Sequence, residues 1–246
     1  MFKKAIFAAT VLCAFTFQSC KKDDPDPIPV VVTAPAVTLP TSITGVDGIL
    51  AAISTTTKSS GVEVTVGTAH AVFYKDKNPK NKVDAGTLKI NSTETTKADD
   101  LTYYYAPTAT KPKGLDVTGQ VYWLGNGNSA TGVPAIDDND NDLLNIPVLG
   151  EFVIMNTTQD YNLNWVSSFG GDSVIVIIKG GSGTYKKVVA SSTTQLLVNK
   201  ADIAKLGKGL GSITIVNYKL QLKPFGTKMY AFLKEVMAVC SKLTVQ

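Results

Sequence analysis

The sequence contains no arginine, and this absence restricts the kinds of partner we expect. All 24 basic residues are lysines, and the formal net charge is only +4. Nucleic-acid-binding proteins gather Lys and Arg on one surface and use Arg for bidentate contacts. We therefore expect no nucleic-acid partner.

Histidines and catalytic motifs are also scarce. His70 is the only histidine, so a metal site with two or three histidines is excluded, and a Ser-His-Asp site would have to use this residue. It stands between two alanines in a predicted strand, where we expect a core or strand-face side chain. No G-x-S-x-G nucleophile motif is present. We expect no enzyme activity, no catalytic residue and no cofactor.

The N-terminus has the plan of a secretory signal. Lys3 and Lys4 precede an apolar run over residues 5–17, and Ser19-Cys20 follows it. The run is shorter than the roughly 20 apolar residues of a membrane span. This segment resembles a bacterial lipoprotein signal peptide. The resemblance implies that residues 1–19 are removed and that Cys20 becomes the lipid-bearing first residue, with palmitate among its acyl chains. The alternative is an ordinary signal peptide that is cut elsewhere.

The residues after Cys20 carry a second resemblance. Lys21-Lys22-Asp23-Asp24 is similar to the short signal that sends lipoproteins of Bacteroidota to the outer face of the outer membrane. The alternative is a solvated charge cluster. Residues 20–35 are rich in proline, which fixes φ and favours an extended chain, so we expect a tether there. The expected location is the outer membrane, lipid-anchored and at the cell surface.

Cysteine is too rare for a disulfide to stabilise the fold. Removal of residues 1–19 takes away Cys13, and acylation would occupy Cys20, so Cys240 alone remains. We expect no intrachain disulfide, and we expect Cys240 to be a buried apolar residue.

The rest of the chain is rich in short runs typical of strands. Val62, Val64 and Val66 alternate with polar residues, and Gly67 predicts a turn or bulge before the next run. Residues 174–178 are apolar on both faces, which predicts a central strand. A short helix is expected over residues 200–206. The fold class expected is all-β, built from antiparallel, Ig-like β-sandwiches.

Two points of architecture stay open. We expect an N-terminal β domain over residues 36–145 and a C-terminal β-sandwich domain over 146–246, with one continuous large sandwich as the alternative. Residues 229–245 carry apolar side chains at helical spacing, but the all-β context favours a strand.

The order of these runs resembles a group of Bacteroidota surface lipoproteins with β-sandwich ectodomains and no known function. The segments that carry the likeness are structural: GILAAI, GTAHAVF, AGTLKIN, DSVIVII, GSITIVNY and GTKMYAFLKE. The resemblance implies a fold and a location, and it implies no activity and no functional residues.

The acidic run at residues 137–142 is the sharpest polar cluster. Asp138, Asp140 and Asp142 place oxygens at alternate positions, as Ca²⁺ sites do, but the glycine and glutamate of an EF-hand are replaced by Leu143 and Leu149. We expect an ordinary acidic loop and no metal site, with a calcium loop of another kind as the alternative.

Aromatic residues supply the expected binding site. Neighbouring strand residues face opposite ways, so about half of Tyr103, Tyr104, Tyr105, Tyr122 and Trp123 should lie in the core. Trp123 and Tyr122, beside a Gly/Asn-rich loop, are the expected ligand-binding residues, with Trp123 exposed, and Trp165 is expected in the core. The expected function is non-catalytic binding of a glycan or a protein by a monomer. The alternatives are a hydrolase that uses scattered carboxylates and a structural envelope protein.

Overall fold

The computed structural model describes residues 43–246 except 60 and 167–169. The expected signal peptide, Cys20 and the expected tether lie outside the described residues. The described residues belong to one compact unit. No helix in the described part of the chain is long and apolar enough to cross a membrane.

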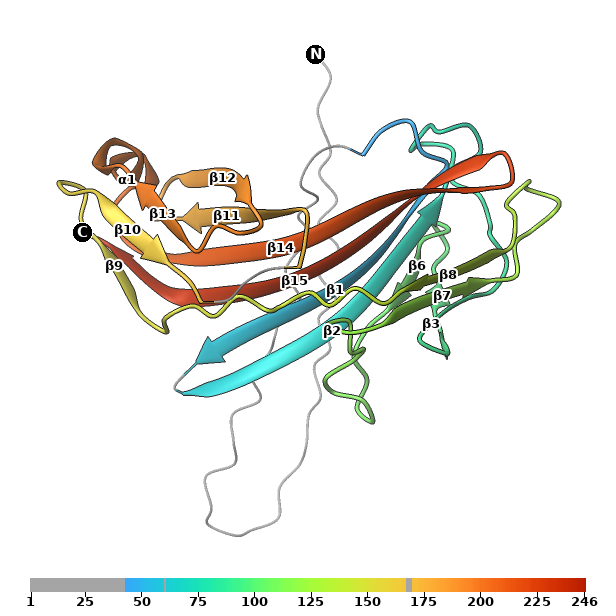
Figure 1. Cartoon of the computed structure of the whole chain (residues 1–246), viewed down its shortest axis with the longest axis horizontal. Coiled ribbons are helices and arrows are strands. Elements are labelled where there is room, and N and C mark those ends of the chain that lie inside the picture. Colours follow the sequence, from blue (N-terminus) through green and yellow to red (C-terminus); the bar gives the residue numbers. More distant parts are fainter. Residues whose placement is uncertain (1–42, 60, 167–169) are drawn as a thin grey trace, which may run out of the picture. The chain divides into compact units, whose positions relative to one another are not determined.

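The fold is mostly β, as expected, and is built around a sheet of nine strands (Figure 1). Its order is β12 (Thr184–Ala190), β11 (Ser173–Lys179), β14 (Gly209–Phe225), β15 (Lys228–Val245), β1 (Gly48–Ser59), β2 (Val62–Phe73), β6 (Tyr103–Tyr105) and β5 (Thr96–Lys97), and β9 (Val153–Met155) also pairs with β15.

Two smaller sheets and one helix complete the described fold. One sheet has the order β4 (Thr93–Glu94), β3 (Leu88–Ile90), β7 (Val121–Gly125) and β8 (Ile136–Asp140). The other pairs β10 (Tyr161–Asn164) with β13 (Gln195–Val198). Within the described residues, α1 (Lys200–Leu206) is the one helix, and it lies where the sequence predicted it.

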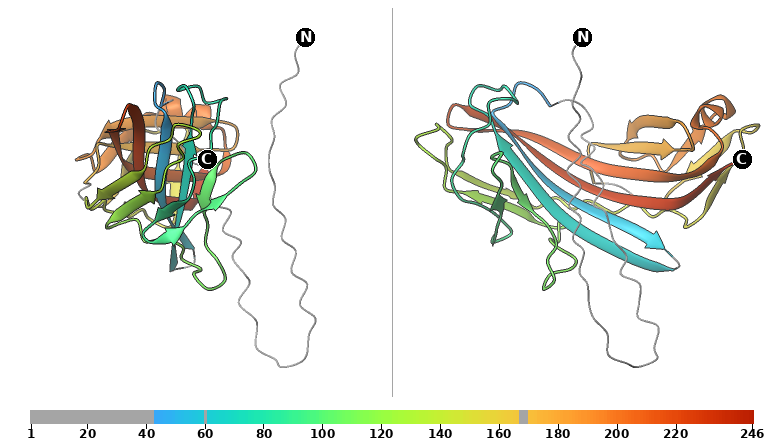
Figure 2. Two further views of the ribbon diagram at one scale, coloured as in Figure 1. Left: turned by 90° about the vertical axis from the view of Figure 1, so that its right-hand side faces the viewer. Right: turned by 180° about the vertical axis from the view of Figure 1, so that it is seen from behind.

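Most pairs among the described strands are antiparallel, and two are parallel. β1 runs parallel to β15 from the Gly48–Tyr230 pair to the Thr57–Val239 pair, and β9 runs parallel to the end of β15. Strands from both halves of the chain therefore share the nine-stranded sheet. The expected division between residues 145 and 146 does not coincide with any division of this sheet. Figure 2 shows the long β14–β15 hairpin beside β1 and β2.

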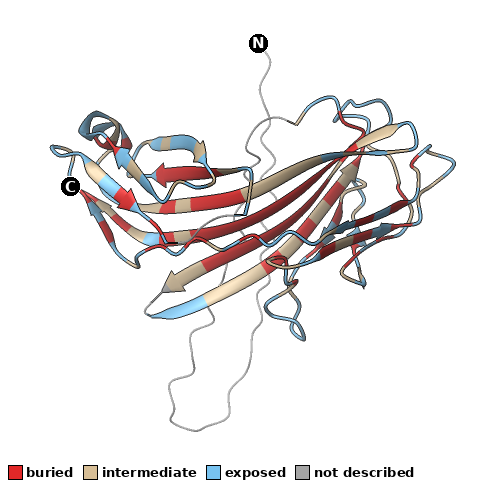
Figure 3. Cartoon of the chain, viewed as in Figure 1, coloured by how far each residue is buried: buried red, intermediate tan, exposed pale blue. Residues whose placement is uncertain are grey.

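The burial of β15 explains why the sequence of residues 229–245 fits both a helix and a strand. The structure confirms the strand over Lys228–Val245. Both faces of its middle are buried, so apolar residues occur at nearly every position and the period-2 signal is lost (Figure 3). A similar continuous burial over Val174–Ile178 confirms the central strand β11.

Two cores pack against one face of the large sheet. Alternation along β15 places Phe232, Ala238 and Cys240 on the same face. Phe232 belongs to the core beneath the β3–β7–β8 sheet, whereas Ala238 and Cys240 belong to the core beneath β10, β13 and α1. Cys240 is buried, as expected. A third apolar cluster lies on the opposite face and includes Leu233 and Met237.

Gly67 corrects one expectation, because it is neither a turn nor a bulge. β2 runs through it without interruption. The backbone of residues 113–115 crosses close to it: the Gly67 amide donates to the Lys113 carbonyl at 2.9 Å, and the Leu115 amide donates to the Gly67 carbonyl at 3.1 Å. A Cβ on Gly67 would lie 1.8 Å from the Leu115 carbonyl oxygen. Close backbone approach is the reason for this glycine.

Candidate functional site

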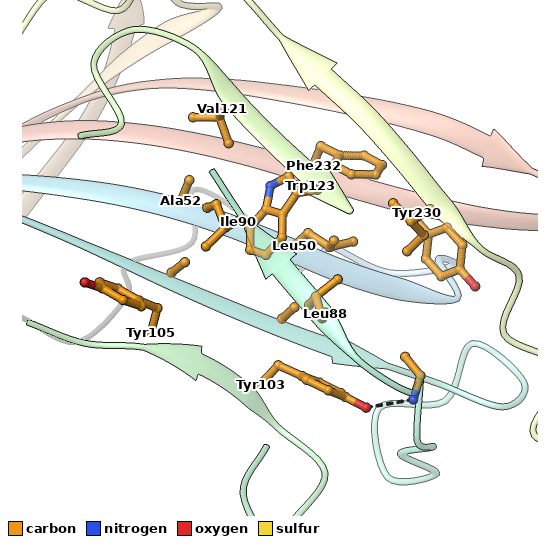
Figure 4. Close-up of a cluster of buried hydrophobic side chains, with 14 of the residues drawn as sticks. Leu50, Ala52, Leu88, Ile90, Tyr103, Tyr105, Val121, Trp123, Tyr230 and Phe232 are labelled. Atoms are coloured by element: carbon orange, nitrogen blue, oxygen red, sulfur yellow. Dashed lines mark hydrogen bonds between the residues drawn. The ribbon is translucent and has the colours of Figure 1, made fainter. Parts of the chain in front are cut away.

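The alternation of side chains along β7 determines which of the two expected ligand-binding residues, Trp123 and Tyr122, is accessible to a ligand. Its side chains alternate, with Val121 and Trp123 directed into the core and Tyr122 and Leu124 directed outward. The expectation that Trp123 is exposed is wrong, since only 2% of its surface is accessible. Figure 4 shows Trp123 packed among Leu50, Ile90 and Phe232. Tyr122 is half-buried and lies on the outer face.

β8 was missed by the sequence reading, because its aspartates and asparagines are typical of a loop. It pairs with β7 along its whole length, and its side chains alternate in the same way. Asp137 and Asn139 point outward beside Tyr122, whereas Asp138 points inward and is 7% exposed. We call the outward surface formed by Tyr122, Leu124, Asp137 and Asn139 the Tyr122 face.

Asn91 fixes the backbone under this surface. Its side-chain oxygen accepts a hydrogen bond from the Tyr122 amide at 2.8 Å, and its own amide donates to the Tyr122 carbonyl at 2.9 Å. The Asn91 side-chain amide also donates to the carbonyls of Asp116 and Gln120, at 3.1 and 3.2 Å. Asn91 adopts a positive φ of 45°, which asparagine tolerates better than most residues. Tyr122 is thus held on a rigid strand.

The polar groups of the Tyr122 face form hydrogen bonds with one another and with the neighbouring Gln120. The Tyr122 hydroxyl bonds to the Asp137 carboxylate, and this bond raises the pKa of the tyrosine. The Gln120 side-chain amide donates to the Asn139 side-chain oxygen at 2.8 Å. A flat apolar ring bordered by carboxylate and amide groups can stack against a ligand and accept or donate hydrogen bonds at its edge.

The remaining aromatic residues lie as alternation predicts. Tyr103 and Tyr105 are buried, and Tyr104 is 37% exposed. Tyr103 accepts a hydrogen bond from the Ala85 amide at 2.9 Å (dashed in Figure 4) and donates one to Asp84 at 2.6 Å. Bonds from Lys97 and Tyr103 lower the pKa of Asp84 to about 2. Trp165 lies in the core, as expected, at 3% exposure.

The carboxylates of the acidic cluster form ion pairs with lysines. Asp138 forms an ion pair with Lys223 at 2.5 Å, and Lys219 pairs with both Asp140 and Asp142. Lys234, 3% exposed, donates to the carbonyls of Gly119 and Asp142, and burial lowers its pKa. These pairs fasten β8 to the large sheet and supply the positive charge that a calcium ion would bring. Among described residues, no group of three or more His, Cys, Asp or Glu side chains could hold a metal.

His70 lines an open cavity of about 270 Å³ on the face of the large sheet that points away from the core containing Trp123. The other lining residues are Ile49, Ala51, Ala71, Val72, Tyr74, Lys82 and Thr102. Its side chain is half-buried, and burial lowers its pKa, which favours the neutral imidazole near pH 7. The described lining contains no serine, cysteine or carboxylate that could pair with it. The placement agrees with the expected strand-face histidine.

Comparisons with known proteins identify no relative by sequence. No protein-family model matches the chain, and no curated protein matches it. Among solved structures, the crystal structure of DIP-gamma IG1+IG2 is 11% identical, with 81% of this chain and 98% of that chain covered and a TM-score of 0.21. This is a weak structural similarity to an Ig-domain protein, and no functional inference rests on it.

Proposed function

We propose that this chain is an outer-membrane-anchored, surface-exposed lipoprotein whose β ectodomain binds a glycan without catalysis. The Tyr122 face is the binding site in this proposal. The observation that carries it is the tyrosine ring on β7, bordered by Asp137 and Asn139, on a backbone that Asn91 holds by hydrogen bonds.

The chemistry of the Tyr122 face suits a sugar better than an apolar ligand. A sugar ring presents C–H groups on its faces and hydroxyls around its rim. The tyrosine ring can pack against the C–H groups, and carboxylate and amide groups can bond to the hydroxyls. Because Tyr122 is held by backbone hydrogen bonds, little ordering of the protein is needed on binding.

A glycan array with the full chain and its Tyr122→Ala variant tests the binding site. We expect the variant to bind about tenfold more weakly, because the stacking surface is lost. Tyr104→Ala, which removes an exposed tyrosine from β6 in the large sheet, is the matched control and should bind like the unaltered chain. An array without binding, or equal losses in the two variants, would contradict the proposal.

The anchor is tested separately. Cys20→Ala should abolish acylation, because the thiol that accepts the lipid is gone, and the protein should leave the membrane fraction or remain uncleaved. Palmitate labelling of the variant would contradict the lipoprotein assignment. Protease treatment of intact cells then tests surface exposure: we expect the ectodomain to be digested without breaking the outer membrane.

A further inference from the structure

The outer edge of β2 is left without a partner over residues 62–66 in the part of the chain that the structure describes. β6 pairs with β2 only from Ala69 to Ala71, and residues 113–115 bond only to Gly67. Beyond Gly67, β2 continues to Val62 with β1 along its inner edge. Figure 1 shows this end of β2 at the border of the sheet, and Figure 3 shows it as half-buried and exposed.

The direction of the free backbone groups follows from Gly67. Both its amide and its carbonyl bond outward to residues 113–115. Backbone groups alternate sides along a strand, so Glu63 and Thr65 also direct theirs outward, whereas Val62, Val64 and Val66 bond toward β1. The free edge therefore offers the N–H and C=O groups of Glu63 and Thr65 to an added strand.

The side chains on this edge give little of the usual protection. Natural sheets guard an open edge with charged side chains, above all lysine, with proline or with a bulge, and Glu63 is the one charged residue in this stretch. The opposite border of the same sheet, β12, carries the exposed residues Lys186 and Lys187. The stretch Val62-Glu63-Val64-Thr65-Val66 has no lysine or proline, and its three valines share one face. Val62 is 63% exposed.

We propose that this edge is a dimerisation surface, at which two copies of the chain pair their β2 strands in antiparallel fashion about a two-fold axis at Val64. The five-residue stretch is symmetric in its apolar pattern, so it complements itself. Glu63 of one copy then lies opposite Thr65 of the second copy, and each such pair exchanges two backbone hydrogen bonds. Val62 meets Val66 of the second copy, and the two Val64 side chains meet at the axis.

The same register explains why the pairing ends where it does. One residue beyond Val62, the partner strand would reach Gly61 in the β1–β2 turn, opposite Gly67. Gly67 is already bonded to residues 113–115. The second copy must therefore turn away at Gly61, and the pairing ends at the Val62–Val66 pairs, where the two sheets join into one. An isologous contact of this kind closes on itself and does not propagate into fibres.

Cysteine cross-linking in the full chain tests the two-fold axis. In a non-hydrogen-bonded antiparallel pair the Cα atoms lie about 4.5 Å apart, a separation that a disulfide can span. Val64→Cys should yield a covalent dimer under mild oxidation. Val188→Cys, at an exposed valine on β12, is the matched control and should stay at the background level of the unaltered chain. Absence of the Val64→Cys dimer, or equal dimer in both variants, overturns the proposal.

Sedimentation of the unaltered full chain in detergent supplies a second measurement that needs no cross-link. We expect a concentration-dependent dimer, which Val64→Lys weakens about tenfold because two ammonium groups would face each other at the axis. A monomer at every concentration overturns the proposal. The proposal is also overturned if the chain binds an added peptide of residues 61–67 as a strand but does not associate with itself. The edge would then bind an extended peptide of another protein.

Discussion

At the scale of single residues, Glu235 is a buried carboxylate within the large sheet. It lies on β15 with none of its surface exposed, and neither carboxylate oxygen has a hydrogen-bond partner among the residues that the structure describes. Its cross-strand neighbours are Ile53 of β1 and Tyr218 of β14. Burial disfavours the charged carboxylate and raises the pKa of Glu235 to about 7.

This pKa makes stability depend on pH in a defined direction. Below pH 4.5, the ordinary pKa of the side chain, both the folded and the unfolded states carry the proton. Between pH 4.5 and about 7 the folded state keeps a proton that the unfolded state has lost. The free energy of unfolding therefore falls as pH rises through this window, by roughly 3 kcal/mol in total.

Glu235→Gln should remove this pH dependence. We expect urea titrations at pH 5 and pH 8 to show that the variant gains stability relative to the unaltered chain as pH rises, because it has no proton to lose. His70 titrates in both proteins, so the quantity to compare is their difference at each pH. Glu94→Gln, at an exposed site on β4, is the matched control. Parallel pH profiles for the Glu235→Gln variant and the unaltered chain would contradict the assignment.

At the scale of elements, the long strands depend on glycines at backbone crossings. Gly67 and Gly114 form the crossing of β2 with residues 113–115: a Cβ on Gly114 would lie 2.0 Å from the Gly67 carbonyl oxygen, and the φ of Gly114 is +68°. Neither position accepts a side chain without moving the other backbone. Residues 113–115, the strap across β2, fix one limit of the free edge of β2.

Gly67→Ala should loosen this strap and destabilise the fold. The added methyl meets backbone atoms that cannot rotate away, and overpacking of this kind costs about 1–3 kcal/mol. Chemical denaturation measures the loss. Gly119→Ala serves as the control, since a Cβ there meets nothing within 4 Å. Equal stability of the two variants would mean that residues 113–115 move aside freely.

At the scale of the whole described unit, β15 joins the two halves of the chain. It pairs with β14 on one side and with β1 on the other, over most of its length. Val64 of the proposed dimer edge and Tyr122 of the proposed glycan site belong to different sheets, so the two proposals can fail independently.

Limited proteolysis should show that the halves do not separate. Cleavage between β7 and β8, in residues 126–135, cuts the chain but leaves the β1–β15 pairing intact. We expect the two fragments to elute together under native conditions and to part only in denaturant. Two fragments that separate and each remain folded would instead support division into independent domains near residue 145.

The sequence by itself determined the elements whose signals are local. Alternating valines marked β2, the apolar run at 174–178 marked β11, and the short helix expected over residues 200–206 coincides with α1. Burial on one face or both leaves these patterns in consecutive residues, so no knowledge of partners is needed. The all-β fold class followed from such runs.

Only the tertiary structure decided the rest, because the deciding partners are distant in sequence. Trp123 and Tyr122 both fit a strand, and the core beneath the sheet selected which one turned inward. In the sequence, Asp138 is typical of a loop. In the structure its carboxylate forms an ion pair with Lys223 of β14, and this pairing allows Asp138 to lie in the strand β8. The parallel pairing of β1 with β15 joins residues about 180 positions apart, and no local pattern encodes such a partner.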